Sequence, residues 1–206
     1  DLFEAVWGAG SLDDVASAYD MVALSIAAFE RTALFAPFSS KYDLYLAGQA
    51  TLTQQELDGL ALFEGKAMCS ACHLSEEGPG GEPPLFTDFT YDNLGVPKSD
   101  HYLLKDLQTD NGLGGVLADP ALYGLFKVMT LRNIGLTAPY AHNGFFDTLG
   151  DITHFYNTRD VETEGWADAE VPDTVNPVEL GDLGLSDDDE DALVEFMMTL
   201  TDGWTP

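Results

Sequence analysis

The 206-residue sequence carries 36 acidic and 8 basic side chains, and its net charge of -28 argues against nucleic acid or an anionic membrane surface as a partner. Apolar residues make up 45% of the chain, an ordinary globular proportion, so the charge imbalance does not predict disorder. The sequence has no run of about 18 apolar residues, so we expect no membrane span.

The first long element is a helix predicted to begin near Ser11, where Asp13 and Asp14 place acids at the positive end of the helix dipole. It is expected to continue to about residue 33, because Pro37 cannot extend it. Apolar residues recur every three or four positions along it: Val15, Tyr19, Val22, Ile26, Phe29 and Ala33. We expect this face to lie in the core.

Two shorter helices are predicted next, at residues 41–46 and from Thr53 onward. Glu56 follows Thr53 by three residues, which is the spacing of a capping box. The second of these helices leads directly toward Cys69. Its apolar residues are expected to face the core or a bound group: Leu57, Leu60, Ala61 and Phe63.

The only two cysteines lie two residues apart and are followed by a histidine: Cys69-Ser70-Ala71-Cys72-His73. This spacing is typical of c-type haem attachment, in which the thiols of Cys69 and Cys72 bond to the haem and His73 binds the iron as proximal ligand. A disulfide would leave His73 unexplained, and a redox dithiol usually follows a strand. A four-ligand zinc site would need further thiols or histidines. We therefore predict one covalent haem c.

Residues 75–125 are rich in Gly, Pro, Asp and Asn, so long ordered loops are expected there, organised by the haem. A short helix is predicted at residues 148–157, and Ser186 with the acids after it should cap a final helix. The predicted fold is mainly α: a single cytochrome c-like helical domain, residues 1–206, around one covalent haem with long ordered loops.

Three segments after the haem motif closely resemble the bacterial di-haem cytochrome c peroxidase and MauG family: Phe86-Thr87-Asp88-Phe89, the run from Asp92 to Pro97, and the run from Leu131 to Gly144. Members of this family have two haem domains. The resemblance is to the C-terminal one, which carries the electron-transfer haem, and it extends over nearly the whole chain. It implies that the N-terminal haem domain is absent from this chain.

The resemblance also suggests a second iron ligand. The family places it seventeen residues after the proline that matches Pro139, a count that leads to Tyr156. MauG has a tyrosine ligand at the matching place, and a phenolate would stabilise ferric iron. A partly buried aromatic residue with a hydrogen-bonded hydroxyl is the alternative interpretation of Tyr156. Other possible iron ligands stay open: Met129, Met197, Met198 and His154.

Further sites follow from the same resemblance. The family holds calcium between its haems with backbone carbonyls at the positions of Thr137 and Pro139, and carbonyl oxygens suit that cation. Arg132 is a candidate partner of a haem propionate, with a structural ion pair as the alternative. His142 is expected near the haem edge, hydrogen-bonded and not bound to iron.

The predicted function is that of an electron-relay domain of a peroxidase-like or MauG-like oxidoreductase, passing electrons to or from a peroxide-reactive haem. The alternative is a non-enzymatic mono-haem electron carrier or a haem subunit of a larger assembly. No catalytic acid/base pair is evident in the sequence. We expect a second haem domain or a redox protein as partner, for which a cationic surface would suit the acidic chain. Covalent haem attachment implies a periplasmic or extracellular location.

Overall fold

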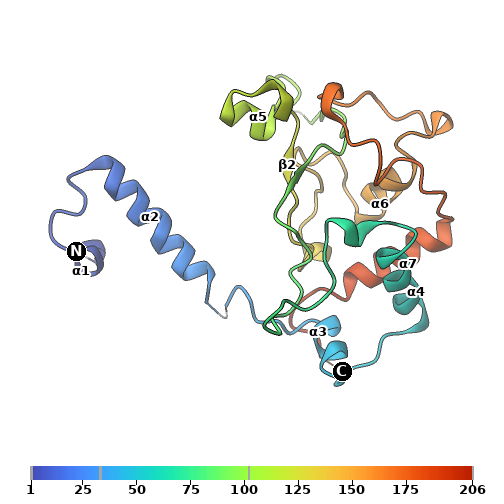
Figure 1. Ribbon diagram of the computed structural model, residues 1–206, viewed down its shortest axis with the longest axis horizontal. Helices are drawn as coiled ribbons and strands as arrows, with labels where there is room; N and C mark the ends of the chain where they lie inside the picture. Colours follow the sequence, from blue (N-terminus) through green and yellow to red (C-terminus); the bar gives the residue numbers. More distant parts are fainter. Residues whose placement is uncertain (1, 33, 102, 206) are drawn as a thin grey trace. The chain divides into compact units, whose positions relative to one another are not determined.

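The computed structural model describes residues 2–32, 34–101 and 103–205, which form two compact units, Asp1–Phe38 and Ser39–Pro206 (Figure 1). The first unit contains α1 (Leu2–Trp7) and α2 (Val15–Glu30). The indole nitrogen of Trp7 donates a hydrogen bond of 3.0 Å to the hydroxyl of Ser25 and so joins the two helices. The N-cap of α2 is Asp14, whose carboxylate accepts from the backbone N–H of Ser17, and not Ser11.

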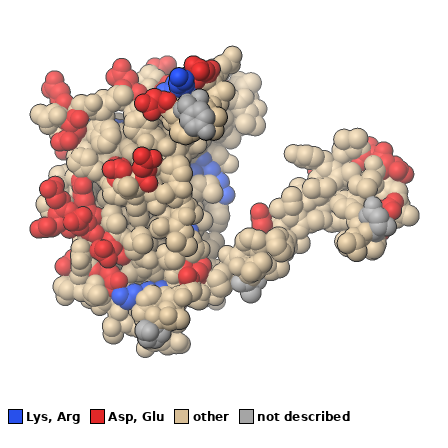
Figure 2. Space-filling view, turned by 180° about the vertical axis from the view of Figure 1, so that it is seen from behind, with Lys and Arg blue, Asp and Glu red and all other residues tan. Residues whose placement is uncertain are grey.

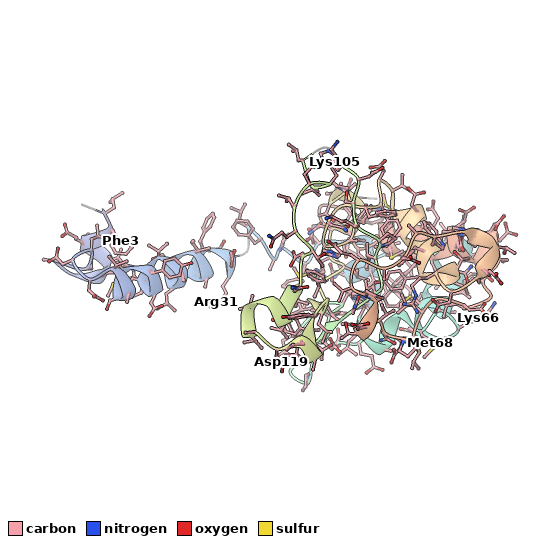
Figure 3. All side chains as sticks on the ribbon, turned by 90° about the horizontal axis from the view of Figure 1, so that it is seen from above. Phe3, Arg31, Lys66, Met68, Lys105 and Asp119 are labelled. Carbon is pink, nitrogen blue, oxygen red and sulfur yellow. The ribbon has the colours of Figure 1, made fainter. Side chains whose placement is uncertain are left out.

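The apolar face of α2 is not core within this unit, so that prediction is wrong. No residue of α2 is buried, and Val15 is 82% exposed. In Figure 3 the described side chains between the labelled Phe3 and Arg31 stand around the helix without a second layer over them. Periodicity identifies residues that share a face, but it does not say which element covers that face. Ala33, the last predicted member of the stripe, lies outside the described residues.

In the part of the second unit that the structure describes there are five α-helices, a two-stranded antiparallel sheet and five single turns of 3-10 helix. The α-helices are α3 (Lys41–Leu46), α4 (Gln54–Glu64), α5 (Gly112–Leu117), α6 (Leu149–Thr158) and α7 (Asp187–Met198). The strands are β1 (Tyr91–Asp92) and β2 (Phe126–Lys127), with Tyr91 opposite Lys127. The 3-10 turns are η1 (Cys69–Ala71), η2 (Pro120–Leu122), η3 (Ile134–Leu136), η4 (Glu162–Glu164) and η5 (Pro172–Thr174).

Capping boxes fix the starts of four of these helices. Ser40, Thr53, Thr148 and Ser186 each accept a hydrogen bond from the backbone of an acid three residues later, and that acid accepts one in return. The predicted helix starts at Thr53, Thr148 and Ser186 are confirmed, as is the helix at residues 41–46. The segment predicted as loops is largely irregular, although it contains β1, α5 and η2.

The core of the second unit lies where α4 and α7 pack side by side (Figure 1). Gly59 permits this contact, because a Cβ atom on it would lie 1.9 Å from the carbonyl oxygen of Ala192. Fully buried aromatic rings meet edge to face around the crossing, among them Phe63 and Phe196 with centroids 5.1 Å apart. Leu57 and Leu60 pack against this core as predicted, whereas Ala61 is exposed.

The surface of the second unit is strongly acidic, as Figure 2 shows for one face. Among the residues that the structure describes, no helix is long and apolar enough to cross a membrane, which agrees with the expectation from the sequence.

Candidate haem-binding site

A cavity of about 580 Å³ lies inside the second unit, walled by α4, α6, α7 and the β2 region. Its lining includes Cys69, Cys72, His73 and Tyr156, so the haem motif and the residue predicted to lie opposite it share one space. Most of the remaining wall is apolar, from side chains such as Phe63 on α4. A volume of this size is ordinary for a cofactor site.

The two thiols reach the cavity from a tight turn that follows α4. Met68 adopts a left-handed conformation, with φ 56°, immediately before η1, and the N–H of His73 donates to the carbonyl of Cys69 at 2.9 Å. Neither cysteine is in a disulfide. Burial raises the pKa of the Cys69 thiol to about 12 and also raises that of Cys72, so both thiols are protonated at neutral pH. The structure therefore presents two free thiols at one cavity wall.

His73 is oriented for metal binding through one ring nitrogen. Its Nδ1 lies 2.8 Å from the backbone carbonyl oxygen of Phe86, so Nδ1 carries the hydrogen and Nε2 keeps its lone pair. Burial lowers the pKa of the His73 imidazole, against the opposing effect of the Phe86 carbonyl, and the ring is neutral at neutral pH. Phe86 itself is fully buried and has φ 52°. A neutral, tethered imidazole of this kind is the form that binds iron.

Tyr156 enters the cavity from α6. The residue is partly buried, and desolvation is the main reason why the pKa of its phenol is raised, with Cys69 and Cys72 contributing. Without a cation in the cavity the phenol is therefore neutral. A positive iron centre would act in the opposite direction on its pKa. The side chain lies on the wall of the same cavity as His73.

The rival ligands divide into two groups. Met129 and Met197 line the cavity, whereas Met198 and His154 are not among its lining residues. Both nitrogens of His154 face carboxylates, with Nδ1 3.0 Å from Glu190 and Nε2 3.4 Å from Glu164. The geometry therefore favours Tyr156, Met129 or Met197 over the other two.

Arg132 is held in a buried ion pair away from the cavity. Its guanidinium lies 2.5 Å from Asp43 and 3.6 Å from Asp202, and it donates to the Pro84 carbonyl at 3.0 Å. The side chain is 8% exposed and is not part of the cavity lining. The structure supports the ion-pair alternative for Arg132 and gives no support to its role as a propionate partner.

The polar residues that the sequence analysis missed lie on the cavity wall. Asp92, Lys127 and Glu179 reach it from β1, β2 and the 172–183 segment. His142, which was expected near the haem edge, also lines the cavity. Among the lysines and arginines that the structure describes, Lys127 alone lines this cavity. No local sequence pattern groups these residues, because each comes from a different segment of the chain.

Thr137 and Pro139, whose carbonyls are the candidate calcium ligands, also line the cavity. Neither carbonyl accepts a hydrogen bond from a described residue. Among the described residues, no group of three or more His, Cys, Asp or Glu side chains could hold a metal ion. The calcium hypothesis thus depends on backbone oxygens alone.

Comparison with known proteins finds MauG proteins and cytochrome c peroxidases as relatives. The chain is 37% identical to the methylamine utilization protein MauG of Paracoccus denitrificans over 97% of its own length, and 32% identical to the cytochrome-c peroxidase IdrP2 of Denitromonas iodatirespirans over 77%. The chain spans about half the length of these relatives, 56% of the first and 43% of the second. No family model matches.

Solved structures agree with the sequence relatives. The diheme peroxidase BthA from Burkholderia thailandensis superposes with a TM-score of 0.83 and 31% identity over 98% of this chain and 55% of its own. A MauG-like protein associated with microbial copper homeostasis gives a TM-score of 0.62 and 30% identity over 80% of this chain and 52% of its own. The mostly helical fold with little sheet is that of one part of a di-haem peroxidase.

Proposed function

Because the chain belongs to the family of MauG and the bacterial cytochrome c peroxidases, a family of oxidoreductases, we propose that it carries one haem c and relays electrons to or from a peroxide-reactive haem. The observation that supports this proposal best is the cavity that brings the thiols of Cys69 and Cys72, the imidazole of His73 and the phenol of Tyr156 together. The partner that supplies the second haem would be another domain or protein, and covalent haem attachment would place the chain in the periplasm or outside the cell.

The residues present fit the proposed cofactor. Two free thiols at one wall would hold the haem covalently, and the Nε2 of His73, oriented by the Phe86 carbonyl, would bind its iron. The mostly apolar walls would limit the access of water to the bound haem, which is a condition for controlling its redox potential. When bound, the haem supplies a one-electron couple.

Haem attachment is tested by the mass of the mature protein. We expect the chain, produced together with a c-type maturation system, to gain the mass of one haem. The variant C69S/C72S should gain none, and the matched control Ser70→Ala, in the same turn, should gain one. A wild-type chain of unmodified mass would refute the haem site.

We also propose Tyr156 as the second iron ligand. Replacing it by phenylalanine should remove a tyrosinate signature from the ferric absorption and resonance Raman spectra. Tyr140→Phe is a matched control, because Tyr140 lines the same cavity but its hydroxyl donates to the Ile134 carbonyl at 2.9 Å. Equal spectra for wild type and Tyr156→Phe would exclude ligation and leave Met129 and Met197 as the remaining ligands on the cavity wall.

The relay role is distinguished from the alternative, a mono-haem carrier, by reaction with peroxide. The alternative is supported by the single haem motif, since the sequence has two cysteines. In stopped-flow mixing we expect the haem-loaded chain to turn over no peroxide alone and to exchange electrons with a peroxide-reactive haem domain of a relative. Electron exchange with small redox proteins but not with that domain would favour the carrier.

A calcium ion bound by the carbonyls of Thr137 and Pro139 is a further proposal. Its support is that both carbonyls lack hydrogen-bond partners among the described residues. Calorimetric titration with calcium should show heat for the haem-loaded chain, and no heat would exclude the site in this chain.

A further inference from the structure

His142 is a cavity-lining histidine that the haem motif does not use. Its ring stacks on Phe126, with centroids 3.8 Å apart and planes inclined by 10°. Its Nε2 lies 3.5 Å from a carboxylate oxygen of Glu170, and the two side chains are only 14% and 7% exposed. The aromatic face and the carboxylate together hold the imidazole in one orientation at the cavity wall.

The charged groups around this ring are mostly acidic. Glu170 is the direct neighbour, and Asp110, from the loop before α5, adds a second negative charge close by. The other charged groups on the cavity wall are Lys127, Asp92 and Glu179. Burial nevertheless lowers the pKa of His142, and Glu170 and Asp110 oppose this effect only in part. The ring is therefore neutral at neutral pH, with carboxylates beside it that would stabilise the protonated form.

We propose that His142 takes up one proton from solvent when the haem in this cavity accepts one electron, so that electron transfer through the domain is coupled to proton binding. The inference rests on the proposed haem site. The electron comes from an external one-electron reductant and converts ferric iron to ferrous iron. The neutral ring keeps its hydrogen on Nε2, facing Glu170, so the added proton binds Nδ1 and no covalent bond of the protein breaks.

The physical reason is the change of charge inside an apolar space. Reduction adds one negative charge to the cavity, and this charge favours the protonated imidazole. A unit charge about 10 Å from a titrating group, at an effective dielectric constant of about 20, changes its proton affinity by roughly tenfold. Burial lowers the pKa of His142 in the oxidised state, so reduction raises it from below the ordinary value of a histidine.

The test is the midpoint potential of the haem-loaded chain, measured by spectroelectrochemistry between about pH 5 and about pH 8. The wild-type potential should fall by about 59 mV in total over this range, which is a tenfold change of the reduction equilibrium. His142→Phe, which keeps an aromatic ring against Phe126, should lose this fall. The control His101→Asn, at an exposed loop position, should retain it. A flat wild-type potential, or an unchanged fall in His142→Phe, would overturn the proposal.

A second variant keeps the test decisive where His142→Phe does not retain haem. Glu170→Gln removes the carboxylate beside the ring, so the fall in potential should move to lower pH. A fall at the wild-type pH would show that another group takes up the proton and would overturn the proposal. A chain that gains no haem mass would refute the haem site, whereas a loaded chain with a flat potential would refute the proton coupling alone.

Discussion

Replacing Gly59 on α4 by alanine should affect stability in two opposite ways, because helix propensity favours the change and packing opposes it. Alanine is favoured over glycine in a helix interior by about 1 kcal/mol, so Gly59→Ala would stabilise α4 in isolation. In the folded chain the new Cβ would lie 1.9 Å from the Ala192 carbonyl oxygen and 2.8 Å from the Cβ of Phe196. A carbon–oxygen contact needs about 3.3 Å, so α4 must move away from α7 by roughly 1.4 Å.

The size of the effect follows from the atoms that block the space. Overpacking a core costs about 1–3 kcal/mol, and the upper end applies here because the nearest atoms are backbone. After the gain in helix propensity, we expect a net loss of about 2 kcal/mol in the free energy of unfolding. This loss corresponds to a melting temperature lower by about 4–8 °C.

The assay is guanidinium unfolding followed by the haem absorption band, which reports on the second unit. Gly150→Ala is the matched control: it makes the same change in α6, but its Cβ would meet only the Thr148 hydroxyl oxygen, at an ordinary 3.7 Å. The control should be as stable as wild type or more stable, by up to about 1 kcal/mol. If Gly59→Ala were as stable as the control, the close approach of α4 and α7 would be wrong.

Three further predictions concern ion pairs and acid. Arg132→Met should destabilise the chain to chemical unfolding by about 3–5 kcal/mol, because it leaves the Asp43 and Asp202 carboxylates buried without their cation. Lys66→Met should cost less than about 1 kcal/mol, since the pair of Lys66 with Asp189 spans 3.7 Å and its side chains are 50% and 32% exposed. Although burial alone would raise the pKa of Asp43, hydrogen bonds from Arg132 and Ser40 hold it below its ordinary value. The free energy of unfolding should therefore fall as the pH drops below about 4, and this acid-induced loss should be smaller in Asp43→Asn than in wild type.

The parts of the fold that were predictable from sequence depend on neighbours along the chain. The capping boxes at Thr53, Thr148 and Ser186 involve residues three positions apart, so the sequence alone indicates where those helices begin. The haem motif from Cys69 to His73 is equally local. Each of these signals involves residues only a few positions apart. The structure has the three helix starts where they were predicted, and it places the motif on one cavity wall.

The parts that were not predictable depend on contacts between distant residues. Arg132 meets Asp43 across 89 positions, and no local pattern distinguishes that ion pair from a propionate contact. The apolar stripe of α2 has the periodicity of a core helix, yet no residue of α2 is buried in the described structure. His142 and Glu170 become neighbours only because the intervening chain folds back.

The two sides of the candidate haem cavity are held in place by different means. His73 is tied to the backbone by the Phe86 carbonyl, within a segment whose thiols and imidazole have one fixed spacing. Other parts of the wall come from side chains of separate elements: the phenol of Tyr156 from α6, the thioether of Met197 from α7 and that of Met129 from the segment after β2. The candidate attachment residues therefore belong to one short segment, whereas the candidate second ligands come from separate elements.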